Sequence, residues 1–454
     1  MKNLPTLNEI LENPAVKSLV NKISRGEIVS TALIVLGELA LQTRQSAAEM
    51  TLPTVSEVAN RIALRITEGD PTRMVPTVNA TGQLLPEELG PPPLASEAIT
   101  AITELARDYV AMGRPLSVWD SRQQLKSVKT LLGRLMDAES VIAVNNPLSA
   151  WFLLLAALEK QTSVVIGRNQ LCRLPERCSV IDVCQQTENP VIEVGTVNYT
   201  TIDDYANAIN SPDRAIWYIY PNHFNQIGRI TIPKLADLAK VAKSKKVPLI
   251  VDLAMYGLWP RENMDDEPSA AGCLAAGADA VILRGAGMFG GPSCGVILGK
   301  KGLLDKCLSK PFAPAALCDP LVLTALEQTL LLYSQPDRGK NSIPLRLMFD
   351  VSEENLENRA KRLQAQIQVS PIVQAIEIES GFNRLTFTGS GAARIPTRRL
   401  RIWPKSRSVE ELSVTLLKSS PAILGVIDND SFILDLQTVL PRQDRYLAEA
   451  FEIG

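Results

Sequence analysis

Short, continuous apolar runs alternate with helix-like segments through the middle of this chain, from about residue 125 to residue 300. Seven runs are predicted to be strands: 140–144, 163–166, 190–194, 215–220, 247–251, 280–283 and 295–298. Apolar runs without polar alternation are typical of strands that are buried on both faces. The pattern therefore predicts a mostly parallel sheet that is covered by helices on both sides.

The segments on either side of this region have other patterns. Residues 1 to about 75 are predicted to be helical, with a helical stripe through Leu33, Leu36 and Leu39 and a helix start at Thr54. After about residue 345, one helix and alternating strands are typical of a smaller α+β domain. We expect three domains: a helical N-terminal domain (1–75), a large α/β domain (76–340) and a small C-terminal α+β domain (341–454).

Composition agrees with a globular protein of several domains. The chain has 454 residues, which is too long for one ordinary core, and its 46% hydrophobic and 21% charged residues are usual for soluble proteins. A net charge of −2 gives no overall attraction to nucleic acid, although a local basic face stays compatible with it. The N-terminus has no apolar signal region and no apolar run is long enough to span a bilayer, so we expect a cytoplasmic protein without a membrane partner.

The cysteines argue against a metal site and a disulfide framework. There are seven, they are scattered, and none forms a C-x-x-C pair. An odd, scattered set fits reduced thiols better than disulfides or zinc ligands. We therefore expect no bound metal.

Candidate chemistry lies at the ends of two predicted strands. The run 247–251 ends in Asp252, and the run 280–283 leads into a glycine-rich turn over 284–292. A strand that ends in an acid, a helix, and a strand that ends in a lysine make the layout of a pyridoxal-phosphate site. In such a site the acid pairs with the pyridinium nitrogen and the lysine holds the aldehyde. Here the acid is present, but no lysine occurs between Lys246 and Lys300.

Short motifs along most of the chain support one family. They occupy, in order, residues 4–6, 78–82, 144–146, 193–198, 252–253, 290–292, 326–330 and 427–436. With these motifs the chain resembles bacterial selenocysteine synthase, the L-seryl-tRNA(Sec) selenium transferase family of fold-type I pyridoxal-phosphate enzymes. The resemblance implies a fold-type I transferase-like α/β fold with a helical N-terminal segment and a small C-terminal α+β domain.

The sequence departs from the family pattern where the chemistry would take place. The lysine position is occupied by Gly287, and the third asparagine of the family's Asn-Asn-Asn turn is replaced by Pro147. Glycine can neither form the internal aldimine nor carry the substrate proton. Proline removes a backbone N–H from a turn that would face the phosphate at a helix N-terminus. We therefore expect no catalytic residue at position 287.

The resemblance implies a cofactor site made of six residues: Asn145, Asn146, Asp252, Arg284, Gly290 and Gly291. Each has a second interpretation. Asp252 could be an acid at a strand end that caps the next helix, and Arg284 could form a salt bridge over an abandoned pocket. The glycines could cradle an anion or form a tight turn with positive φ. Pyridoxal phosphate, if it binds, would be held noncovalently.

Two further features have a functional and a plain interpretation. His223, the only histidine, follows a predicted strand and could act as a base or stack on a ring, or it could be a loop residue without a role. The densest basic cluster could contact RNA phosphates or be a solvated face of the small domain. Its members are Arg394, Arg398, Arg399, Arg401, Lys405 and Arg407.

Two functions of different classes remain at this stage. The first is a divergent homologue of the selenium transferase that lacks lysine-dependent catalysis and acts as a binding or scaffold protein. The second is an active pyridoxal-phosphate-dependent transferase that converts seryl-tRNA(Sec) to selenocysteinyl-tRNA(Sec). The resemblance also implies a homo-oligomer, a dimer or larger, and tRNA as a partner.

Overall fold

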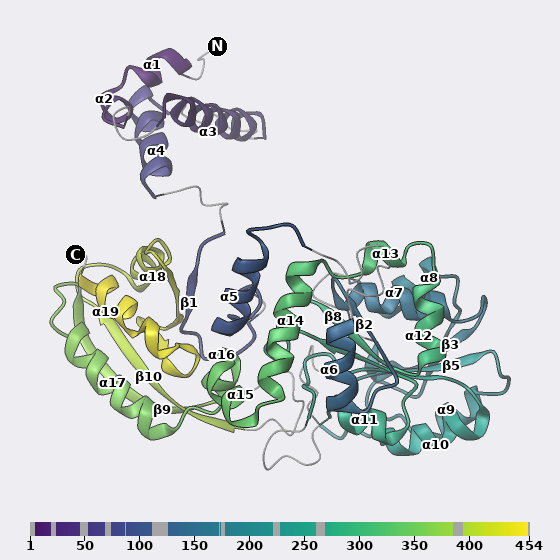
Figure 1. Cartoon of the computed structure of the whole chain (residues 1–454). Coiled ribbons are helices and arrows are strands. Elements are labelled where there is room, and N and C mark those ends of the chain that lie inside the picture. Colours follow the sequence, from purple (N-terminus) through teal and green to yellow (C-terminus); the bar gives the residue numbers. More distant parts are fainter. Residues whose placement is uncertain are drawn as a thin grey trace. The chain divides into compact units, whose positions relative to one another are not determined.

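Figure 1 shows the chain in a computed structural model, which describes residues 5–19, 24–45, 53–68, 74–86, 88–110, 126–171, 173, 178–220, 228–259, 268–384 and 394–452. The chain divides into two compact units. One contains Met1–Val78 and Glu411–Leu424, and the other contains Asn79–Glu410 and Gly425–Gly454. The expected domain boundaries at residues 75 and 340 stay predictions.

The first unit is mainly helical and has its own apolar core. Ile10, Ile28 and Ile62 are fully buried in it. One helix begins where the sequence predicts, because Thr54 and Glu57 form a reciprocal capping box with N–H···O distances of 2.7 and 3.3 Å. The elements are α1 (Leu7–Leu11), α2 (Pro14–Lys17), α3 (Arg25–Gln45), α4 (Val55–Glu68) and a two-stranded sheet of β1 (Thr77–Asn79) and β11 (Ala422–Leu424).

A seven-stranded sheet forms the centre of the second unit. Its order is β2-β8-β7-β6-β5-β3-β4, and β8 runs opposite to the other six strands of this sheet. The predicted strands are all present, and their ends differ from the prediction by at most two residues. The strands are β2 (Ser140–Val144), β3 (Ser163–Gly167), β4 (Val191–Val194), β5 (Arg214–Ile219), β6 (Leu249–Asp252), β7 (Ala280–Arg284) and β8 (Gly295–Gly299).

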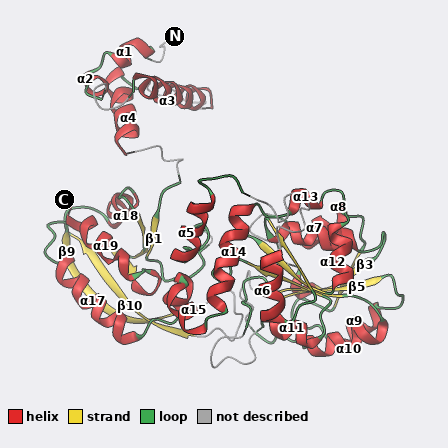
Figure 2. Cartoon of the chain, in the orientation of Figure 1, coloured by secondary structure: helices red, strands yellow, loops and turns green. Residues whose placement is uncertain are grey.

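Helices cover both faces of this sheet, as the continuous apolar runs predict (Figure 2). Successive residues of one strand point into different cores: Val141 and Ala143 lie in one apolar cluster, and Ile142 and Val144 lie in the other. One face is covered by α6 (Lys126–Met136), α9 (Ile202–Ala208), α10 (Leu235–Lys245), α11 (Ala270–Ala276) and α14 (Pro320–Tyr333). The other face is covered by α7 (Pro147–Ala157), α8 (Val180–Gln186), α12 (Lys301–Leu308) and α13 (Ala313–Ala316).

The C-terminal part of the chain adds a separate antiparallel sheet, as the change of pattern after residue 345 predicts. The sheet has the order β12-β13-β10-β9, and α17 packs on β9 and β10 and against α19. The strands are β9 (Val373–Arg384), β10 (Arg394–Pro404), β12 (Val426–Asp428) and β13 (Ser431–Asp435). The remaining helices are α5 (Ser96–Leu105), α15 (Pro336–Ser342), α16 (Pro344–Phe349), α17 (Glu353–Ile367), α18 (Val409–Leu417) and α19 (Asp444–Glu452).

Candidate functional site

The residues expected to form a cofactor site follow the carboxyl ends of three strands. Asn145 comes directly after β2, Asp252 is the last residue of β6, and Arg284 is the last residue of β7. Because β2, β6 and β7 run in the same direction, their carboxyl ends lie at the same edge of the sheet. This edge is where open α/β sheets bind ligands.

Asp252 is completely buried, and each of its carboxylate oxygens accepts a hydrogen bond from this chain. The indole Nε1–H of Trp151 donates to Oδ2 at 2.5 Å, and the backbone N–H of Ala254 donates to Oδ1 at 2.6 Å. Ala254 holds a positive φ of 50°, which turns the chain back towards the carboxylate. Among the described residues the next helix is α11, which begins at Ala270, and Asp252 does not cap it but bonds to Trp151 and Ala254 at the sheet edge.

Trp151 is a site residue that the sequence did not indicate. It lies one turn into α7, is fully buried, and meets Trp217 edge to face, with ring centroids 6.1 Å apart and an interplanar angle of 82°. In the sequence it is the first residue of an apolar run, so its pattern predicts a core residue and nothing more. Asp252, which accepts the hydrogen bond of Trp151, is 101 positions away in the sequence.

The turn between β2 and α7 satisfies its own polar groups. The Asn145 side chain donates to the carbonyl of Ala315 at 3.1 Å. The Asn146 side chain caps α7 by accepting from the N–H of Ser149 at 2.8 Å, and Pro147 has no N–H to offer. Backbone N–H groups at a helix N-terminus can bind phosphate. Here residue 147 has no N–H, and the N–H of Ser149 already donates to Asn146.

The glycine-rich turn after β7 folds back on itself. Gly285 donates its N–H to Cys294 at 2.9 Å, Gly291 donates to Gly285 at 2.8 Å, and Gly290 donates to Gly287 at 2.9 Å. Among these glycines Gly290 has the left-handed φ, 68°. The turn therefore uses its N–H groups internally, as the second interpretation of these glycines expects.

Gly287 has no room for a side chain. A Cβ atom there would lie 2.9 Å from the carbonyl oxygen of Met255 and 3.3 Å from that of Arg284. The same Met255 oxygen accepts the N–H of Met288 at 2.8 Å, which fixes the loop after β6 against the glycine-rich turn. Arg284 itself is 7% exposed and thus buried at the end of β7.

Aromatic rings line the neighbouring part of this edge. Tyr220 follows β5, donates its N–H to the carbonyl of Asp252 at 3.0 Å, and packs against Tyr218 and Tyr256 at centroid distances of 5.0 and 5.8 Å. Burial strongly raises the pKa of Tyr220, so its hydroxyl stays protonated. His223, the histidine considered as a base, lies outside the described residues.

Three arginines of the basic cluster lie on β10 and are paired with acids. Arg398, Arg399 and Arg401 each form ion pairs within the second unit, and the hydrogen bond from Arg398 lowers the pKa of Glu357. The N···O distances are 2.7 Å for Arg398–Glu357, 2.8 Å for Arg399–Asp435, 2.6 Å for Arg401–Glu379 and 2.9 Å for Arg401–Asp428. Carboxylates therefore offset the charges of these three arginines, which weakens the attraction of this part of the cluster for RNA phosphates.

Comparison with known proteins identifies the family. The family model described as L-seryl-tRNA selenium transferase matches residues 77–440. An L-seryl-tRNA(Sec) selenium transferase of Carboxydothermus hydrogenoformans is 30% identical over 463 residues, which cover 100% of this chain and 97% of that protein. The chain belongs to the L-seryl-tRNA(Sec) selenium transferase family.

Other matches agree with this assignment. The selenium transferase of Moorella thermoacetica is 27% identical, with coverage of 99% of this chain and 96% of that protein. Among solved structures, a D-glucosaminate-6-phosphate ammonia-lyase superposes with a TM-score of 0.58 at 18% identity, covering 84% of this chain and 95% of that chain. This likeness concerns the fold, and it confirms the fold class expected from the sequence.

The described residues of this selenium transferase family member do not fit pyridoxal phosphate held as a Schiff base. The sequence has no lysine at the end of β7, and the place of a side chain at Gly287 is closed by backbone atoms. The acid that would meet the pyridinium nitrogen is bonded to Trp151 and Ala254. The lysine position thus holds Gly287, and both the acid and the turn after β2 make hydrogen bonds within the chain.

Among the described residues, no three histidine, cysteine or carboxylate side chains come together as a metal site. In the same part of the chain, no helix has the length and apolar character needed to cross a bilayer.

Proposed function

We propose that this chain is a member of the selenium transferase family that lacks lysine-dependent pyridoxal-phosphate catalysis and acts as a binding or scaffold protein. One observation carries the proposal. Gly287 stands where the resemblance places the lysine, and the carbonyl oxygen of Met255 lies 2.9 Å from the position of its missing Cβ. This observation supports the proposal, because Gly287 cannot form a Schiff base and a side chain at this position would meet backbone atoms.

The acid at the end of β6 supports the same proposal. In a pyridoxal-phosphate enzyme this carboxylate is kept for the pyridinium nitrogen. Here Asp252 is buried, and both of its carboxylate oxygens accept hydrogen bonds, from Trp151 and Ala254, without a cofactor. The buried acid is then a structural group, and it needs no ligand to be stable.

The binding role rests on the family. The relatives are named for a reaction on seryl-tRNA(Sec), so we propose tRNA as a partner of this chain and a homo-oligomer, a dimer or larger, as its assembly. We also propose a cytoplasmic location. The ion-paired arginines of β10 are not part of this proposal, because their charges are matched.

The second function, an active selenium transferase, is favoured by one observation. Asp252 is retained at the end of β6, as in an enzyme that binds the cofactor. This function requires a lysine from another part of the chain or a cofactor that is held without one.

Titration with pyridoxal phosphate separates the two functions. We expect no absorbance band of an internal aldimine when the purified protein is titrated. After borohydride reduction and peptide mapping, we expect no lysine to carry a pyridoxyl group. A single lysine trapped in saturable fashion would overturn the proposal and support the active transferase.

Replacing Gly287 by lysine tests whether the position is closed. Since the new Cβ meets backbone at 2.9 Å, we expect the Gly287→Lys variant to lose about 1–3 kcal/mol of stability and to form no aldimine. Gly302→Lys is the matched control, because Gly302 is the second residue of α12 and has no atom within 4 Å of the point where a Cβ would stand. The control should change stability by less than about 1 kcal/mol, since the gain in helix propensity is offset by a cation at the helix N-terminus. Thermal unfolding measures the stability of the two variants, and absorbance shows whether an aldimine forms. An aldimine in a Gly287→Lys protein of undiminished stability would contradict closure by Met255.

A further inference from the structure

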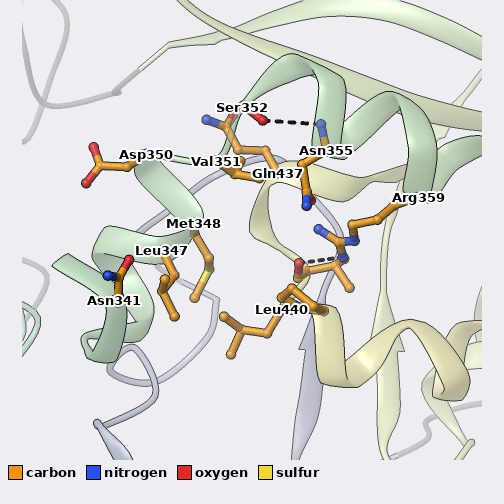
Figure 3. A pocket seen from close by; sticks show the side chains of 12 residues that line it. Asn341, Leu347, Met348, Asp350, Val351, Ser352, Asn355, Arg359, Gln437 and Leu440 are labelled. Carbon is orange, nitrogen blue, oxygen red and sulfur yellow. Dashed lines mark hydrogen bonds between the residues drawn. The ribbon is translucent and has the colours of Figure 1, made fainter. Parts of the chain in front are cut away.

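We draw no further inference here: the strongest candidate, the cavity between α16, the start of α17 and the segment 437–441 in the second unit (Figure 3), carries none, because the Arg359 guanidinium in its wall is already paired with Asp444 and nothing in the described residues shows what ligand it would hold.

Discussion

Two tryptophans in contact differ in one hydrogen bond. Trp151 and Trp217 are both fully buried and touch edge to face. The indole N–H of Trp151 donates to Asp252, whereas that of Trp217 has no acceptor in the described part of the chain. A buried carboxylate is stable only while it keeps its donors, so the two rings are expected to contribute unequally to stability.

Replacing each tryptophan by phenylalanine measures this difference. Both changes remove a similar apolar area, but Trp151→Phe also leaves Oδ2 of Asp252 without its donor. We expect Trp151→Phe to lower the free energy of unfolding by about 1–3 kcal/mol more than Trp217→Phe does. Urea denaturation of both variants gives the comparison. Equal losses of stability would mean that the hydrogen bond to Asp252 contributes no stability beyond the packing of the ring.

At the scale of elements, α17 and α19 are joined by ion pairs in which Asp444 of α19 accepts from two arginines of α17. Arg359 and Arg362 both reach Asp444, at 2.6 and 2.7 Å. The Arg359 side chain is 4% exposed and that of Arg362 is 58% exposed. Burial makes the loss of a partner costly, while solvent screens the outer pair.

The two arginines of α17 should therefore respond differently to the same substitution. Arg359→Met leaves Asp444 poorly compensated in the interior and is expected to cost about 3–5 kcal/mol. Arg362→Met is expected to cost less than about 1 kcal/mol. The midpoints of urea denaturation of the two variants measure these losses of stability. A small loss for Arg359→Met would show that water reaches this pair.

At the scale of the whole molecule, buried cysteines lie in the cores on both faces of the central sheet. Cys273 lies in the core on one face, and Cys184 and Cys307 lie in the core on the other. Burial raises the pKa of each of these thiols from 9.0 to about 12. Since thiolate is the reactive form, these cysteines are protected for as long as the sheet keeps both of its layers.

Alkylation with iodoacetamide, followed by peptide mapping, tests this protection. At about pH 8 a thiol with a pKa near 12 is ionised in roughly one molecule in ten thousand, so Cys184, Cys273 and Cys307 should react only after unfolding in urea. Half-buried Cys178 is the internal reference and should react before these three. Above pH 9 the unfolded chain releases these protons and the folded chain does not, so stability should fall as the pH rises towards 12. Native labelling of Cys273 as fast as Cys178 would contradict the buried core.

Local patterns were sufficient for the elements and for the family. Continuous apolar runs predicted the strands of the large sheet, and Thr54 with Glu57 predicted the start of α4, because both signals involve residues that are neighbours in the chain. Ordered motifs pointed to the selenium transferase family, which the comparisons confirmed. The sequence by itself also determined that no lysine follows β7 within the large sheet, since that requires only reading the residues.

The tertiary structure alone decided how the buried polar groups are used. The partner of Asp252 is 101 residues away at Trp151, and the partner of Arg359 is 85 residues away at Asp444. Periodicity tells which face of a helix or strand is buried, but not which distant side chain it meets. The closure of Gly287 by the Met255 carbonyl likewise depends on how separate segments pack, and so does the hydrogen bond from Asn383 to Gln437. A polar side chain therefore acquires its role from its neighbours in space, which the order of residues along the chain does not specify.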